Sequence, residues 1–217
     1  MPENPLTTTA YRIETDRLLM RCWSPADARN LRACLDDNDE HLRPWIPFMR
    51  DEPRSLEQTT EWLRSMRASF DLRQNYRYAV FDVAGKSLLG ENMLLGRVGP
   101  GALEIGYWTD RHATGKGIAS ESTCVMIRVA FEIEKVDRLE IHCDPKNGAS
   151  AAIPRRLGFT HDATLPRRFT NLDGAPCDLM VWSLFADDYP ATPAAQTPLR
   201  AFDALGDPIV LSGSAGA

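Results

Sequence analysis

The architecture of this chain is set by LEIGYWTDRHATGKGIASES, residues 103–122. The segment begins with the apolar alternation of a strand, continues through a loop with Gly115 and Gly117, and ends in a pattern that predicts a helix. Glycines let backbone N–H groups approach a ligand, and a helix N-terminus adds partial positive charge. The segment therefore predicts an anion-binding loop, although a glycine-rich helix start without any ligand has the same local sequence.

Turn signals and apolar spacing predict the elements on both sides of this segment. Gly85-Lys86 and Gly99-Pro100-Gly101 separate three strand patterns, which indicates an antiparallel meander. Two prolines in HLRPWIPFM, residues 41–49, exclude a helix there, so we expect a loop packed over the body. Strands grouped with helices after a meander indicate a mixed α/β layer, not an alternating doubly wound fold. The predicted strands span residues 15–23, 76–83, 88–95, 102–109, 139–143, 159–165 and 179–185. The predicted helices start after Ser24 and Ser55 and at Gly117, and Ser150 is expected to cap the last one.

One domain with a tail at each end is expected from the length of the chain. Residues 1–11 are unpatterned and indicate a flexible arm, whereas residues 12–189 carry the domain. Residues 190–217 indicate an extended linker rich in Pro and Ala, followed by a short hairpin around Gly206-Asp207.

Composition and charge narrow the function classes. The chain has 217 residues, of which 43% are apolar and 25% charged, close to the average of soluble globular proteins. Its net charge of −5 argues against a nucleic-acid partner. Five cysteines have neither a C-x-x-C pair nor metal-ligand spacing, so we expect reduced thiols, no metal site and a cytoplasmic location. Without a leader pattern or an apolar run of 18 residues, no membrane association is expected.

Four ordered motifs resemble the GCN5-related N-acetyltransferase (GNAT) superfamily. TGKGIA, residues 114–119, is similar to its pyrophosphate loop, with Thr114 in place of Arg or Gln, and NGASAAIPRRLGF, residues 147–159, is similar to its N-x-x-S…L-G-F pattern. TDRLLMRCWSPADA and LRPWIPF resemble the RimJ/RimL-like branch, which acetylates the N-termini of ribosomal proteins. The resemblance covers about residues 12–185. It implies the GNAT fold, a mostly antiparallel sheet split by a cofactor cleft and flanked by helices.

The resemblance also implies that acetyl-CoA binds in this cleft. In the family, loop amides hold the pyrophosphate, and the pantetheine arm lies between two diverging strands. Because Thr114 removes a cation from the loop, we hypothesise that Arg155 or Arg156 reaches the 3′-phosphate, and a solvated helix end is the alternative. The implied cofactor-binding residues are Trp108, Thr109, Thr114, Gly115, Lys116, Gly117, Ile118, Ala119, Ser120, Asn147 and Arg156.

Two residues are implied for catalysis. Glu104 lies on the strand beside the expected acetyl position, where it serves as general base or is only a surface carboxylate, and Asp162 and Asp178 are alternative bases. Ser150 matches the serine proposed to protonate the departing thiolate, and its type also suits a helix N-cap. Trp45 and Phe48 are expected either to wall the acceptor slot or to form a packed lid.

These motifs together predict an N-acetyltransferase that moves an acetyl group from acetyl-CoA to a primary amine. The amine attacks directly, without a metal ion or a covalent enzyme intermediate. The acceptor is a protein N-terminal α-amine or a small amine of the polyamine or aminoglycoside type. A non-catalytic acyl-CoA sensor is the alternative from another class. Residues 191–217 are further expected to mediate self-association into a homodimer.

Overall fold

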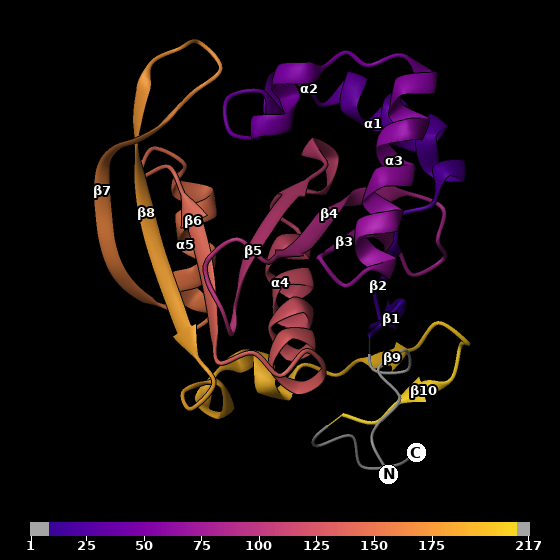
Figure 1. The fold of residues 1–217 in the computed structure, drawn as a ribbon, viewed down its shortest axis with the longest axis vertical. Coiled ribbons are helices and arrows are strands. Elements are labelled where there is room, and N and C mark those ends of the chain that lie inside the picture. Colours follow the sequence, from indigo (N-terminus) through magenta and orange to yellow (C-terminus); the bar gives the residue numbers. More distant parts are fainter. Residues whose placement is uncertain (1–8, 212–217) are drawn as a thin grey trace.

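The strands lie in one sheet. A computed structural model describes residues 9–211 and, within them, places ten strands in a single sheet (Figure 1). Neighbouring strands are antiparallel except β5 and β6, which are parallel, so the expected mixed α/β class is confirmed. In sheet order the strands are β10 (Pro208–Ile209), β9 (Arg200–Phe202), β1 (Arg12–Glu14), β2 (Leu18–Cys22), β3 (Asn75–Asp82), β4 (Leu88–Leu95), β5 (Ala102–Thr109), β6 (Arg138–Cys143), β8 (Pro176–Phe185) and β7 (Thr160–Thr170).

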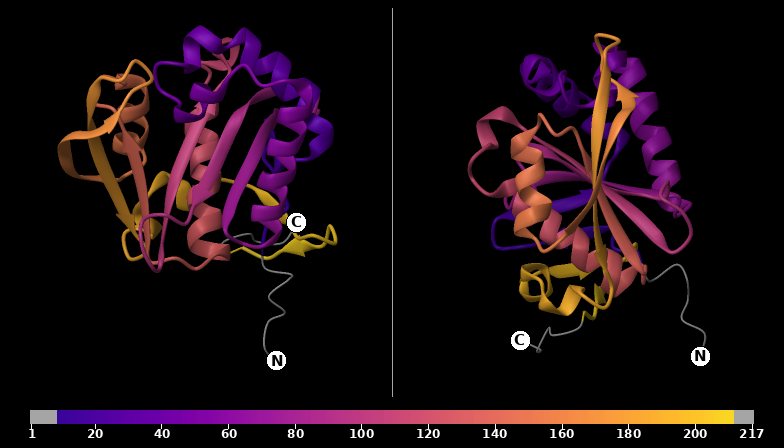
Figure 2. Two further views of the ribbon diagram at one scale, coloured as in Figure 1. Left: turned by 45° about the horizontal axis from the view of Figure 1, so that its top comes forward. Right: turned by 90° about the vertical axis from the view of Figure 1, so that its left-hand side faces the viewer.

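Helices cover both faces of this sheet. α3 lies on one face, and α4 and α5 lie on the other (Figure 2). α1 and α2 run across the end of the sheet at which β5 stops (Figure 1). Buried apolar side chains form two clusters, one that includes Leu63 of α3 and one that includes Val125 of α4. The helices are α1 (Ala28–Asp37), α2 (Asp39–Leu42), α3 (Leu56–Asp71), α4 (Ile118–Arg128), which continues as a π-turn over Val129–Ile133, and α5 (Gly148–Arg156).

Capping boxes open two of the helical segments, after the serines at which helices were expected to start. The hydroxyl of Ser55 accepts from the N–H of Gln58 at 3.1 Å, and the amide oxygen of Gln58 accepts from the N–H of Ser55 at 2.8 Å. The equivalent pair of Ser24 and Asp27 opens a 3₁₀ turn before α1. Each pair satisfies two backbone donors that a helix start leaves unpaired.

The predicted N-cap of α5 is wrong by three residues. The helix begins at Gly148, and Asn147 is its cap, because the side-chain oxygen of Asn147 accepts from the N–H of Ser150 at 3.0 Å. Ser150 is therefore inside the first turn and does not cap the helix. Pro154 lies in the interior of α5, so the carbonyl of Ser150 loses its helical donor.

The segment of residues 41–49 and the C-terminal region are more ordered than the sequence indicated. α2 ends at Leu42 and a 3₁₀ turn covers Pro47–Asp51. In place of an extended linker, 3₁₀ turns at Tyr189–Ala191 and Pro193–Gln196 pack against α4. The predicted short hairpin is present as β9 and β10, and β9 pairs with β1.

Burial explains why the C-terminal segment packs on the domain. Ala194, Ala201 and Leu211 are at most 4% exposed, so apolar contacts hold this region on the domain. Ala10 is fully buried as well, which places it in the body and not in a flexible arm. The expectations for residues 1–8 and 212–217 fall outside the described residues.

Candidate active site

β5 and β6 pair over four residues and then diverge. Their parallel register runs from Ala102 opposite Arg138 to Ile105 opposite Ile141. Beyond this point β5 pairs with β4, and β6 pairs with β8. The β6-facing backbone groups of residues 106–109 are therefore left without a strand partner, which suits an extended ligand that binds as a strand does.

The loop after β5 presents free amides at the N-terminus of α4. Gly115 and Gly117 have φ angles of 72° and 79°, a region that glycine adopts without steric cost. Within residues 9–211, no protein acceptor bonds to the backbone N–H groups of residues 115–120. These donors lie at the N-terminus of α4, which is the positive end of the helix and stabilises a phosphate group. The predicted anion-binding geometry is therefore available.

Distant side chains hold this loop. Asn38 is fully buried, and its Nδ2 donates to Oδ2 of Asp110 at 2.8 Å while its Oδ1 accepts from the N–H of Arg111 at 2.7 Å. Arg17 donates from Nη1 to the carbonyl of Lys116 at 3.1 Å. Neither Asn38 nor Arg17 carries a signal in the sequence, because both lie more than 70 residues from their partners.

α5 brings a cation to the same loop. Arg156 donates from Nη1 to the hydroxyl of Ser120 at 3.0 Å, so its guanidinium lies at the first turn of α4. The Arg155 guanidinium instead lies over the ring of Trp182, 5.6 Å from its centroid. Of the two arginines that the sequence left open, Arg156 is the one beside the loop.

Tyr107, which sequence reasoning missed, contacts Ser150 where β5 leaves β6. Its hydroxyl donates to the carbonyl of Ser150 at 3.1 Å, replacing the N–H that Pro154 lacks, and lies 3.1 Å from the Ser150 hydroxyl. Burial raises the pKa of Tyr107, so the phenol keeps its proton. Burial also raises the pKa of the neighbouring Cys143 thiol, which disfavours the thiolate that a nucleophile needs.

Glu104 is buried on the other face of β5. Its carboxylate accepts from Nε and Nη2 of Arg97 at 2.7 and 2.6 Å, and Nδ1 of His142 lies 3.4 Å from its Oε2. With 4% of its surface exposed, Glu104 is not the solvated strand carboxylate that the sequence also allowed. The ends of β5 and β6 thus carry a hydroxyl pair on one face and a charged group on the other.

A family model decides the identity. The model described as an acetyltransferase (GNAT) domain matches residues 17–160, which contain the diverging strands, the glycine loop and α5. The chain belongs to the GNAT family. It is accordingly an acetyl-CoA-dependent acetyltransferase, as the motifs predicted.

Curated relatives of this GNAT acetyltransferase carry related names. YdaF of Bacillus subtilis, by its name a candidate ribosomal N-acetyltransferase, is 27% identical over 80% of this chain and 94% of its own length. The [ribosomal protein uS5]-alanine N-acetyltransferase of Escherichia coli is 26% identical over 82% of this chain and 92% of its own. The enzyme thus resembles the RimJ/RimL-like branch over most of its length.

Solved structures share the fold. The ribosomal-protein-S5-alanine acetyltransferase of Vibrio fischeri superposes with a TM-score of 0.72 at 23% identity, covering 82% of this chain and 98% of that one. RimL, a ribosomal L7/L12 α-N-protein acetyltransferase in complex with CoA, gives 0.72 at 20% identity and covers 82% and 97%. The expected GNAT fold is therefore confirmed.

Three residues assigned from the sequence differ in what they offer to a ligand. The indole N–H of Trp108 donates to Oε2 of buried Glu91 at 3.0 Å, so only the backbone of Trp108 is free to bind a cofactor. Phe48 packs on the ring of Trp62, with centroids 5.1 Å apart, as a packed lid would. Trp45 is 40% exposed and keeps surface for an acceptor.

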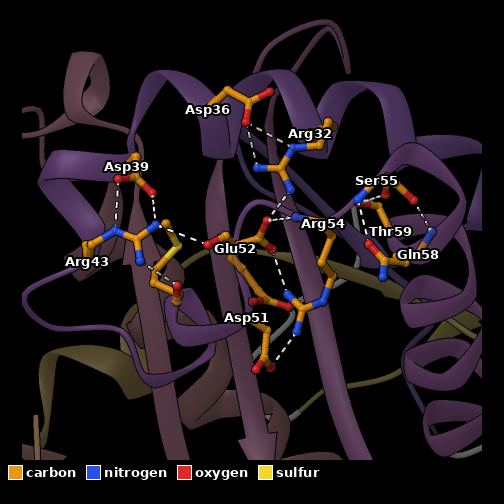
Figure 3. A network of polar contacts seen from close by, with 12 residues as sticks. Arg32, Asp36, Asp39, Arg43, Asp51, Glu52, Arg54, Ser55, Gln58 and Thr59 are labelled. Carbon is orange, nitrogen blue, oxygen red and sulfur yellow. Dashed lines mark hydrogen bonds and ion pairs between the residues drawn. The ribbon is translucent and has the colours of Figure 1, made fainter. Parts of the chain in front are cut away.

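A buried charge network in the enzyme fixes the segment that carries Trp45. Glu52 accepts from Arg32 and, at 2.6 Å, from Nη1 of Arg54 (Figure 3). Arg43 adds a bond from Nη1 to the carbonyl of Met49 at 2.9 Å. α1, α2 and the start of α3 are thereby joined into one unit above the end of β5.

Two structural findings concern ligands and membranes. Among residues 9–211, no group of three or more His, Cys, Asp or Glu side chains is placed to hold a metal ion. The same part of the chain contains no helix that is long and apolar enough to span a bilayer.

Proposed function

We propose that this enzyme acetylates the α-amine of a protein N-terminus by direct attack of the amine on acetyl-CoA. The observation that carries the proposal is the row of free amides at residues 115–120 beside the divergence of β5 from β6. The names of the relatives, which describe ribosomal-protein N-acetyltransferases, support an acceptor of the protein type.

The residues present suit acetyl-CoA. The amides of residues 115–120 and the guanidinium of Arg156 suit the pyrophosphate and the 3′-phosphate. The open edge of residues 106–109 suits the pantetheine arm, as does Nδ2 of Asn147, whose Oδ1 caps α5. When bound, acetyl-CoA supplies the thioester carbonyl that an amine attacks.

An α-amine suits a site with a modest base. Reaching the neutral amine at pH 7 costs about 1.4 kcal/mol for an α-amino group of pKa ~8, but about 4.6 kcal/mol for a lysine of pKa ~10.4. We assign Glu104 to bind the ammonium and to promote the loss of its proton. Positioning the amine against the carbonyl supplies the larger contribution, roughly 7–11 kcal/mol.

The leaving thiolate needs a proton. We assign this donation to Ser150, whose hydroxyl is within hydrogen-bond distance of the Tyr107 phenol. The phenol is in turn kept neutral by burial, which raises its pKa, so the pair holds a proton at the sulfur position. Trp45, which is 40% exposed, is assigned to contact the acceptor.

Mass analysis of product mixtures tests the proposal. The enzyme is incubated with acetyl-CoA and short peptides that begin with alanine or serine, the same peptides with a blocked N-terminus and an internal lysine, spermidine, and an aminoglycoside. We expect acetylation of the free N-termini and little of the blocked peptides. Preferred acetylation of spermidine or the aminoglycoside would assign a small amine instead.

A further inference from the structure

The imidazole of His142 lies between two carboxylates at the end of the paired part of β6. Nε2 is 2.7 Å from Oε2 of Glu140, and Nδ1 is 3.4 Å from Oε2 of Glu104. The first distance is that of a hydrogen bond, whereas no hydrogen bond to Nδ1 is found among the described residues. Because a carboxylate accepts only, Nε2 carries the proton of the neutral ring, and Nδ1 keeps its lone pair.

This arrangement leaves two acceptors facing each other without a donor. Nδ1 lies 3.4 Å from an oxygen of Glu104 without a hydrogen bond between them, and both oxygens of that carboxylate already accept from Arg97. Two adjacent acceptors in a half-buried site are unfavourable until a group with several N–H donors enters. A primary ammonium has three such donors and satisfies both acceptors at once.

The position of His142 matches the reaction site. The last register pair of β5 and β6 is Ile105 with Ile141, so the next residues, Gly106 and His142, flank the start of the divergence. Gly106 has no side chain, and a Cβ there would be 3.0 Å from Cγ of Met93. His142 is therefore the first side chain beyond the paired segment on the Glu104 face, and a fifth of it remains exposed.

Charge around the imidazole also suits one incoming cation. Glu104 pairs with Arg97 of the β4–β5 connection, and Glu140 pairs with Arg138 of β6. Asp162 of β7 accepts from Ser183 of β8, the residue opposite Glu140 in the sheet. The three carboxylates outnumber the two guanidiniums by one, so the surroundings of the imidazole are acidic and suit a single ammonium.

We propose that His142 is a catalytic residue of the enzyme, binding the acceptor amine together with Glu104 and taking its proton at Nδ1. The inference rests on the proposed function and refines it by naming where the proton goes. Glu140 is a positioning residue, because its bond to Nε2 sets the tautomer that leaves Nδ1 free.

The proton balance of the step is complete. The ammonium gives one proton to Nδ1 and becomes a neutral nucleophile. Its nitrogen forms the C–N bond to the acetyl carbon as the C–S bond breaks, and the second proton of the nitrogen passes to the departing sulfur through Ser150. The imidazolium then releases its proton to solvent at its exposed edge, and His142 returns to its starting state.

The variant His142→Gln tests the inference with wild-type acceptor and cofactor. We expect kcat at pH 7 to fall by about 10²-fold, with the deficit shrinking toward pH 9 as the free amine loses its own proton. Added imidazole should restore part of the activity of His142→Ala. His161→Gln is the matched control, because His161 stacks on Trp182 on the opposite face of the sheet. A loss that is equal at all pH values and not rescued by imidazole would overturn the inference.

A second measurement does not depend on turnover. Nitrogen-15 NMR of the four histidines, assigned with His142→Gln, reports which ring nitrogen carries the proton. We expect the Nε2–H tautomer in the wild type and its loss in Glu140→Gln. An Nδ1–H tautomer would refute the role of His142 even if peptides are acetylated. An Nε2–H tautomer in an enzyme that acetylates no amine would instead refute the proposed function.

Discussion

Arg156 donates to the hydroxyl of Ser120 at 3.0 Å, which ties the end of α5 to the first turn of α4. The bond carries a positive charge to the helix end where the backbone amides are free. In this chain Thr114 replaces the cationic residue that is typical of the family's loop. Arg156 of α5 brings a positive charge to the same loop instead.

Arg156→Ala is expected to weaken CoA binding by roughly three- to tenfold, because the guanidinium is exposed and its attraction to phosphate is screened. Calorimetry with CoA and with dephospho-CoA measures the effect. If Arg156 contacts the 3′-phosphate, the loss disappears with dephospho-CoA. Arg155→Ala is the control and should bind like the wild type, since Arg155 lies over Trp182. Equal losses of CoA affinity in both variants would show that the effect comes from the net positive charge of α5 and not from a specific contact of Arg156.

Ser150→Ala is expected to lower kcat by about 10²-fold while leaving the fold intact. The reason is that Asn147, not Ser150, caps α5, so the substitution removes a hydroxyl without removing a cap. The rate at which the CoA thiol is released measures kcat, and thermal melting measures the stability of the fold.

Two other variants separate the roles around Ser150. Asn147→Ala should lose about 1 kcal/mol of stability as a cap residue does. Tyr107→Phe leaves the carbonyl of Ser150 without a donor and should cost about 1–3 kcal/mol. A Ser150→Ala enzyme with unchanged kcat would remove Ser150 from the catalytic set.

Gly117→Ala is expected to lose about 1–2 kcal/mol of unfolding free energy, because residue 117 has a φ angle of 79° and an alanine there is strained. Relief of that strain would move the amides of the loop, so the affinity for CoA should fall as well. Gly148→Ala is the matched control, since its backbone is helical and no atom lies within 4 Å of a Cβ there. Urea unfolding and calorimetry compare the two, and equal behaviour would contradict the assigned strain.

Local patterns sufficed for much of the fold. The capping box at Ser55, the glycine turns of the meander and the loop before α4 depend on residues within a few positions of one another, and these elements are where they were expected. Asn147 and Ser150 are three residues apart and both suit a cap, so spacing alone does not decide between them. The structure decides, because Asn147 makes the bond.

Contacts between distant residues explain what the sequence did not show. The Arg97–Glu104 pair and the imidazole of His142 come together only when β5 and β6 align in parallel, a register that no local pattern encodes. The packing of residues 190–211 was missed for a related reason. Ala194 is buried where its 3₁₀ turn packs against α4, and Ala201 is buried on β9 beside β1. Small residues between prolines resemble a linker until those partners are present.

Stability at high pH should depend on Tyr76. The phenol donates to Oε2 of Glu134 at 2.6 Å, and burial, followed by that bond, raises its pKa to about 12. The unfolded phenol has a pKa near 10, so the folded state holds the proton more tightly. The contribution is complete below pH 10 and is lost as the pH rises from about 10 to 12. In urea titrations Tyr76→Phe should therefore lose less stability over this range than the wild type, whereas parallel curves would refute the assignment.

Removing residues 198–217 should destabilise the domain itself. The deletion eliminates β9 and with it the partner of β1, and it uncovers the surface on which Ala201 and Leu211 are buried. We expect a loss of about 2–4 kcal/mol, which for a chain of this size lowers Tm by roughly 5–15 °C. A deletion of residues 212–217 alone is the control, because it separates the contribution of residues 198–211 from that of the last six residues. Size-exclusion chromatography of both variants addresses self-association, because a segment that serves only dimerisation would change the elution volume and leave Tm unaltered. That result would contradict the view that residues 198–211 are part of the acetyltransferase core.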